Sequence, residues 1–273
     1  MIGKALDRIQ AAGAIATKAE KKVIDGILNI PPEEIIYLSI SDLAARLEVA
    51  DATLVRFCKK LGYNGFQDFK LQLSHEVGMM VRTTDDGTVN RVARQMVDAI
   101  NETSRAINYD EYLVIADKMI KSGKISAFGV GNSAITAMEI SNVLARIGIM
   151  VSYTADPHLQ AMTVSNMKRG DTVILISVSG STKDIIDVAH VAKKNGVNIV
   201  VITCYDHSPL AKYADHILLS TRREAAYEGG SVSTIVSISY IVGILYNAIY
   251  ERLGKKADEY TMRAAKSVAN KSL

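Results

Sequence analysis

Two segments of the chain repeat one pattern, in which a short apolar run leads into a polar loop and then into a helical pattern. The first has a predicted strand at 124–128 and a loop at 129–133, and the second has a strand at 172–176 and a loop at 177–182. Consecutive units of this kind predict parallel strands, because parallel strands need a crossover connection that is usually a helix. The carboxyl ends of these strands would bring both loops to one edge of the sheet.

The composition of the two loops predicts an anion site. Loop 177–182 reads Ser-Val-Ser-Gly-Ser-Thr, and loop 129–133 reads Gly-Val-Gly-Asn-Ser. Free N–H groups at a helix N-terminus attract negative charge. Hydroxyl groups can donate to phosphate oxygens, and glycine lets the backbone approach a ligand closely. We therefore expect a phosphate here, although these hydroxyls could also act as ordinary helix caps.

A dinucleotide site is an alternative interpretation of the first loop. Gly129, Gly131 and Ala134 fit a loosened Gly-x-Gly-x-x-Ala pattern, and Asp156 follows a plausible next strand at 149–153. Such a site does not need a second loop rich in hydroxyl groups, so we expect no nucleotide cofactor. The two cysteines are far apart and form neither a CxxC motif nor a metal-ligand pair, which indicates a reduced, cytosolic chain without a metal site.

The two loops, in this order, resemble those of the sugar isomerase (SIS) domain. The likeness extends through shorter matches at 156–160, 170–171, 202–203, 208–211 and 214–215, and it covers about residues 108–254. The resemblance implies a five-stranded parallel sheet of flavodoxin-like type with helices on both faces. It also implies a phosphosugar ligand.

The same resemblance implies which residues hold the phosphosugar. The hydroxyl groups of Ser133, Ser177, Ser179 and Thr182 would surround the phosphate, and His158 would contact the sugar or simply begin a helix. Glu224 and Glu228 follow the fifth predicted strand, so either could hydrogen-bond to a sugar hydroxyl. The full set of predicted ligand residues is Gly131, Asn132, Ser133, His158, Ser177, Ser179, Gly180, Thr182 and Glu228.

The first eighty residues predict a helix-turn-helix. Thr17 and Glu20 form a capping box that opens a helix ending before Pro31-Pro32. A second helix is expected after Ser41, followed by a turn at 48–50 and a third helix that begins at Asp51. The outer face of the third helix is basic and hydroxyl-bearing, and its predicted DNA-binding residues are Thr53, Arg56, Lys59 and Lys60.

This N-terminal segment resembles the DNA-binding domain of RpiR-family transcription regulators. The matching stretches are 39–44, 52–63 and 65–70. The family joins this domain to an SIS domain in the same order. Two positions depart from the family pattern: Glu48 stands where relatives usually have Gly, and Ala50 stands where they have Ser. Asp51 is an alternative N-cap for the third helix.

The chain is thus expected to comprise four parts. These are a helix-turn-helix domain (1–80), a linker and connecting helix (81–107), an SIS domain (108–254) and a C-terminal helix (255–273). The longest apolar stretch, 235–249, is interrupted by polar residues and predicts a buried helix rather than a membrane span. The net charge of +3 is mild, so a DNA-binding role depends on where the basic residues lie.

Two functions fit these motifs. The first is a cytoplasmic, homodimeric or larger transcription regulator that binds pseudo-palindromic operator DNA under the control of a phosphosugar. The second is a sugar-phosphate isomerase with an appended helical domain. An isomerase needs a carboxylate base beside the sugar carbonyl, for which Glu224 and Glu228 are candidates, and often a histidine, for which His158, His207 and His216 are candidates. A binding module can keep all these groups without turnover, so we expect the regulator rather than an enzyme.

Overall fold

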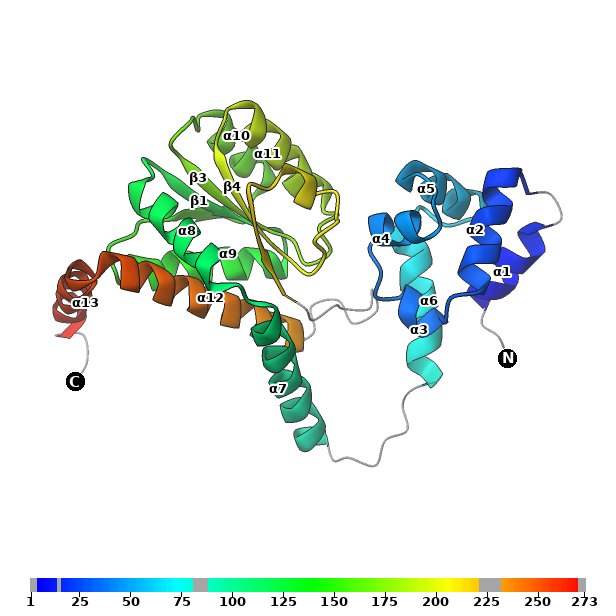
Figure 1. The fold of residues 1–273 in the computed structure, drawn as a ribbon, viewed down its shortest axis with the longest axis horizontal. Coiled ribbons are helices and arrows are strands. Elements are labelled where there is room, and N and C mark those ends of the chain that lie inside the picture. The colour runs from blue at the N-terminus through cyan, green and yellow to red at the C-terminus, as the bar shows by residue number, and fades with distance from the viewer. Residues whose placement is uncertain (1–3, 14–15, 81–87, 221–231, 270–273) are drawn as a thin grey trace. The chain divides into compact units, whose positions relative to one another are not determined.

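A computed structural model describes residues 4–13, 16–80, 88–220 and 232–269 (Figure 1). The chain divides into two compact units at Arg94, and each unit has its own hydrophobic core. The predicted domain boundaries remain predictions. Most of the linker expected at 81–88 lies outside the described residues, as do Glu224 and Glu228.

The N-terminal unit is helical, as predicted. Its helices are α1 (Lys4–Ala12), α2 (Lys18–Leu28), α3 (Pro32–Ile35), α4 (Ile40–Arg46), α5 (Asp51–Lys60) and α6 (Phe66–Met80). The capping box that opens α2 is confirmed: the Glu20 N–H donates to Thr17 Oγ1 at 3.4 Å, and the Thr17 N–H donates to Glu20 Oε2 at 2.7 Å. Leu54, Phe57 and Cys58 of α5 are buried in the core of this unit.

One predicted helix start and one predicted N-cap were wrong, whereas the third helix begins at Asp51 as predicted. The helix α4 begins one residue before Ser41, because Ser39 caps it through a second capping box with Asp42. The side chain of Asp51 does not cap α5, whose N-cap is Ala50 without a side-chain hydrogen bond. Asp51 instead accepts a hydrogen bond from Ser41 Oγ at 2.8 Å, which joins the two helices of the helix-turn-helix across their turn.

The C-terminal unit is an α/β domain, which confirms the predicted fold class. Its strands are all parallel in the order β2-β1-β3-β4-β5. They are β1 (Ile125–Phe128), β2 (Ser152–Thr154), β3 (Thr172–Ile176), β4 (Asn198–Thr203) and β5 (His216–Leu219). The accompanying helices are α7 (Thr88–Ala106), whose first residues belong to the N-terminal unit, α8 (Tyr109–Lys121), α9 (Asn132–Ala145), α10 (Pro157–Ser165), α11 (Lys183–Lys194), η2 (Ala211–Tyr213), α12 (Val232–Leu253) and α13 (Lys255–Val268).

Helices cover both faces of the sheet because the strand residues alternate between two cores (Figure 1). In β3, Ile174 and Ile176 pack on the face covered by α8, α9 and α12, whereas Val173 and Leu175 pack on the face covered by α10 and α11. Both faces of the central strands are therefore buried, which is why these strands are continuous apolar runs in the sequence.

The apolar stretch 235–249 is confirmed as part of a helix, and that helix is longer than predicted. By length and composition alone α12 could cross a membrane, and half of its most apolar window is buried inside the protein. It packs against α8 and α9, and Ile241, Leu245 and Ile249 are completely buried in the core. Core helices of soluble proteins commonly have this character.

The helix α13 confirms the helical C-terminal segment, although α13 ends at Val268. It lies against the turn that follows α9: a Cβ added to Gly148 would be 2.6 Å from the ring of Tyr260. Gly148 also has φ of +79°. Glycine is thus required there both by the backbone conformation and by the close approach of the tyrosine ring.

Candidate functional site

The β1 loop depends on its two glycines. A Cβ on Gly129 would lie 2.5 Å from the backbone carbonyl group of Ser133, so only glycine lets the loop fold back on the first turn of α9. Gly131 has φ of +60° and is the N-cap of α9. Asn132 is exposed and Ser133 is half-buried in the first turn. The predicted ligand residues of this loop are therefore held at a helix N-terminus.

The β3 loop presents a cluster of hydroxyl groups. Ser177 Oγ and Thr182 Oγ1 are hydrogen-bonded at 3.0 Å, and Ser179 Oγ accepts from the Ser181 N–H at 3.2 Å. Thr182 is the N-cap residue of α11, but its side chain makes no capping hydrogen bond. The alternative that these hydroxyls only cap the helix therefore does not hold for Thr182.

Gly180 fixes the path of the same loop. Its φ is +59°, and an added Cβ would lie 2.0 Å from Ser208 Oγ and 2.3 Å from Ser208 Cβ. The Gly180 carbonyl accepts a hydrogen bond from the Leu210 N–H at 3.0 Å. The β3 loop is thus fastened to the segment that follows β4.

The two loops emerge side by side at the point where the strand order reverses. Strands β1 and β3 are neighbours, with Phe128 paired to Leu175, and their following helices α9 and α11 cover opposite faces of the sheet. A crevice outside the carboxyl ends of the strands is the usual binding place in such sheets. The structure therefore brings the two predicted anion loops to the edge of the sheet where such a crevice is expected.

A third loop, the one that follows β2, lies at the same edge of the sheet. Asp156 caps α10 by accepting from the Leu159 N–H at 2.9 Å, which places His158 in the first turn of the helix. His158 is exposed and makes no hydrogen bond or ion pair with any residue in the described part of the chain. His158 thus lies at the start of a helix, as the alternative interpretation expected, and its ring is exposed, so a contact with the sugar stays a prediction.

Gln160, which contacts the β1 loop, was not among the predicted site residues. It is completely buried, and its Nε2 donates to the Gly129 carbonyl and to the Thr154 carbonyl, both at 2.8 Å. The only signal in the sequence was its place in the stretch 156–160. That stretch does not reveal which carbonyl groups the amide meets.

The histidines considered for an isomerase lie at two different edges. His207 follows β4 at the carboxyl edge and is exposed. His216 begins β5, at the opposite edge, where its Nδ1 contacts Glu111 Oε1. His216 is therefore too far along the strand to serve the crevice, and this candidate was wrong.

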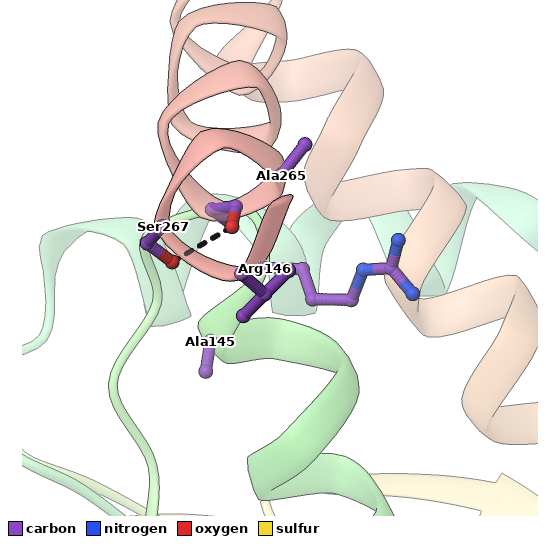
Figure 2. Close-up of a pocket in the computed structure, with 6 residues that line it drawn as sticks. Ala145, Arg146, Ala265 and Ser267 are labelled. Carbon is purple, nitrogen blue, oxygen red and sulfur yellow. Dashed lines mark hydrogen bonds between the residues drawn. The ribbon is translucent and has the colours of Figure 1, made fainter. Parts of the chain in front are cut away.

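A separate pocket lies at the C-terminal end of α9. Figure 2 shows Ala145 and Arg146 facing Ala265 and Ser267 of α13. Its lining is mostly small and apolar, and Ser267 Oγ is already bonded to a carbonyl of its own helix at 2.8 Å. The hydroxyl cluster and helix N-termini that suit a phosphate are at the other end of α9, about 20 Å away. This pocket is not the candidate ligand site.

The candidate DNA-binding surface is the outer face of α5. Arg56 and Lys59 are exposed, and neither forms an ion pair with a residue that the structure describes. Thr53 is half-buried. Lys60 differs, because its Nζ donates to both carboxylate oxygens of Glu20 at 3.0 and 2.9 Å and so joins α5 to α2.

The turn before α5 carries a strained residue. Glu48 has φ of +49°, the left-handed region that favours glycine, which explains why glycine is usual at this turn position. The Lys22 ammonium lies 2.6 Å from the Glu48 carboxylate and lowers the pKa of that carboxyl group. Within α5, burial raises the pKa of the Cys58 thiol to about 12, so this cysteine stays protonated and unreactive.

Both units match known domain families. Residues 3–79 match the helix-turn-helix domain of the rpiR family, and residues 118–248 match the SIS domain. A chain described as an uncharacterized HTH-type transcriptional regulator from Clostridium perfringens is 30% identical over 276 residues, covering 97% of this chain and 99% of that one. A similar regulator from Haemophilus influenzae is 29% identical and covers 89% of each chain.

Solved structures agree with this assignment. The Vibrio vulnificus NanR protein complexed with ManNAc-6P superimposes with a TM-score of 0.91 at 28% identity, covering 98% of both chains. The sugar isomerase domain of an RpiR transcription factor from Sphaerobacter thermophilus has a TM-score of 0.60 at 21% identity and shares the fold over 66% of this chain. Because the likeness to the regulators covers almost the whole chain and both of its units, the chain belongs to the RpiR family of HTH-type transcriptional regulators with an SIS domain.

Proposed function

We propose that this protein is a cytoplasmic transcription regulator whose binding to operator DNA is controlled by a phosphosugar held at the carboxyl edge of its sheet. The observation that carries the proposal is the pairing of the two glycine-dependent loops on neighbouring strands, β1 and β3. The chain that holds this crevice also presents the exposed Arg56 and Lys59 on a helix-turn-helix.

The phosphate would lie against Ser133, Ser179 and Thr182, at the N-termini of α9 and α11. The hydroxyl groups and the positive ends of two helices favour an anion. Asn132 and His158 flank this position and would contact the sugar. Glu228 stays a proposed contact to a sugar hydroxyl.

The ligand class that we propose is an N-acetylated hexosamine phosphate. The support is the structural likeness to NanR, which was solved with ManNAc-6P. The regulated genes would then serve the catabolism of a sugar or amino sugar. The protein acts as a binding module and not as an isomerase.

The regulator would work as a homodimer or a larger homo-oligomer. One helix-turn-helix reads too few base pairs for specific binding, and two recognition helices would need a separation of about 34–36 Å, or a multiple of it, over a pseudo-palindromic site. A phosphosugar that changes the separation of the two heads would change operator affinity. By thermodynamic linkage, operator DNA would then change the phosphosugar affinity by the same factor.

Calorimetric titration with ManNAc-6P, with and without operator DNA, tests the proposal. Ser179→Ala should weaken phosphosugar binding about ten- to hundredfold, because hydrogen bonds to charged groups contribute roughly 1.5–3 kcal/mol. The matched control is Ser165→Ala, which removes an exposed hydroxyl at the far end of α10 that donates to Met162 O at 2.8 Å and accepts from Asn166 Nδ2 at 3.4 Å. Unchanged affinity in the Ser179 variant would remove the phosphate assignment. Formation of an isomerised sugar during the titration would favour an enzyme instead.

A further inference from the structure

The Gln160 amide lies between two loops of the ligand edge, just beyond the end of the strand ladder. The last paired residues of β1 and β2 are Phe128 and Thr154. The next carbonyl on β1, that of Gly129, and the carbonyl of Thr154 both accept hydrogen bonds from Gln160 Nε2 at 2.8 Å. One side chain therefore replaces the missing ladder hydrogen bonds where the two loops diverge.

The chemistry of the amide fixes which way it points. Both neighbours are carbonyl groups and can only accept, so the NH₂ group must face them. Gln160 Oε1 is consequently buried with no hydrogen-bond partner among the residues that the structure describes. A buried acceptor without a partner is unfavourable, and leucine or methionine would fill the same volume without it. The two N–H donors are therefore what a glutamine supplies at this buried position and an apolar side chain could not.

We propose that Gln160 is a positioning residue for the ligand site. Its two N–H groups hold Gly129, at the start of the β1 loop, and Thr154, at the end of β2, at one separation. Ser133 and His158 would thereby meet the same ligand molecule. The identity of that ligand rests on the proposed function. The clamp, by which we mean the two hydrogen bonds from Gln160 Nε2, does not.

Hydrogen–deuterium exchange of the full chain tests the clamp without any ligand. Gln160→Leu and Gln160→Met should both speed exchange in peptides covering 129–133 and 154–158, and should leave peptides covering 177–182 unchanged. Unaltered exchange in the first two peptides of both variants would overturn the inference.

Asn195 provides a matched control. Its Nδ2 also donates to two carbonyl groups, Val164 O at 3.2 Å and Ser165 O at 3.4 Å, but it caps the C-terminal end of α11, away from the ligand loops. Asn195→Leu should therefore leave exchange at the ligand edge and ligand affinity unchanged.

Affinities for two probes distinguish positioning from general support of the fold. ManNAc-6P would reach His158, whereas inorganic phosphate would meet only the β1 and β3 loops. Gln160→Leu should lower ManNAc-6P affinity at least tenfold and phosphate affinity by a smaller factor. Equal losses for both probes would contradict a positioning role. Failure of the unmodified protein to bind either probe would contradict the proposed function, while the exchange measurement would still decide the clamp.

A pH profile supplies a second readout. In the Gln160→Glu variant an ionised carboxylate would face two carbonyl oxygens, and burial there should raise its pKa. The neutral acid has one O–H donor and can restore one of the two hydrogen bonds. ManNAc-6P affinity of this variant, relative to the unmodified protein, should therefore rise as pH falls from 8 to 5. Asp156, the N-cap of α10, and His158, in its first turn, are present in both proteins, so the comparison is made as a ratio. A flat ratio would overturn the inference.

Discussion

The substitution Gly180→Ala should destabilise the C-terminal unit through two separate mechanisms. The first is conformational: Gly180 has φ of +59°, where a residue with a Cβ loses roughly 1–2 kcal/mol. The second is steric, because the new Cβ would lie 2.0 Å from Ser208 Oγ and 2.3 Å from Ser208 Cβ. Overpacking of this kind typically costs about 1–3 kcal/mol. The loss of chain flexibility in the unfolded state offsets about 0.4–1 kcal/mol.

The net loss should be about 2–4 kcal/mol, which corresponds to a fall in melting temperature of roughly 5–15 °C for a unit of this size. Differential scanning calorimetry of the full chain measures it, provided the two units are analysed as separate transitions. Gly170→Ala is the control, since Gly170 has φ of +93° with no atom within 4 Å of an added Cβ. That variant should show only the conformational loss.

A double-mutant cycle isolates the steric part. Ser208→Gly removes the two atoms nearest to the new Cβ and leaves Thr203 Oγ1 at 3.2 Å. The double variant should therefore recover most of the steric loss, about 1–3 kcal/mol relative to the sum of the single changes. The conformational loss should persist. Additivity within about 0.5 kcal/mol would refute the assigned clash with Ser208, and a near-neutral Gly180→Ala would refute both mechanisms.

Two further predictions concern the N-terminal unit. The double variant Arg56→Ala with Lys59→Ala should lower operator affinity in a gel-shift assay and leave phosphosugar affinity unchanged. The slope of log affinity against log salt concentration should fall by about one unit for each DNA phosphate that the variant no longer binds. Unimpaired operator binding would exclude α5 as the helix that reads the DNA. Glu48→Gly should be more stable than Glu48→Ala by about 1 kcal/mol in urea denaturation. Both variants lack the ion pair with Lys22, but only alanine keeps a Cβ at a positive φ. Equal stabilities would show that the turn changes its backbone conformation in the alanine variant.

The parts of this fold that could be predicted are those written in local patterns. The two strand–loop–helix units give the parallel sheet and the crevice, since strand, glycine loop and helix start are contiguous in each. The capping box at Thr17 is equally local. The Ser39–Asp42 box has the same spacing and is just as visible in the sequence, but the prediction put the helix boundary at Ser41 instead.

The features that could not be predicted depend on contacts between residues far apart in the sequence. The spacing of Lys60 puts it on the basic face of α5. Its ammonium group nevertheless forms an ion pair with Glu20, forty positions earlier. The two carbonyl groups that Gln160 meets become neighbours only when β1 pairs with β2. His216 is the first residue of the fifth predicted strand, 216–220, so the sequence already put it at the amino end of that strand and away from the loops.

The parallel sheet also bears on the order in which the protein becomes active during its synthesis. The pairing of Ile125 with Thr172 spans two helices and a strand, and β4 and β5 are added later still, whereas the core residues of α1 to α6 all lie between positions 5 and 77. Non-local pairing slows folding, and domains fold as units from the N-terminus during translation. We expect the nascent chain to fold α5 and the rest of the N-terminal unit before the parallel sheet forms. Proteolysis of ribosome-stalled chains of increasing length would show protection of residues 16–80 first, and simultaneous protection of both units would contradict this order.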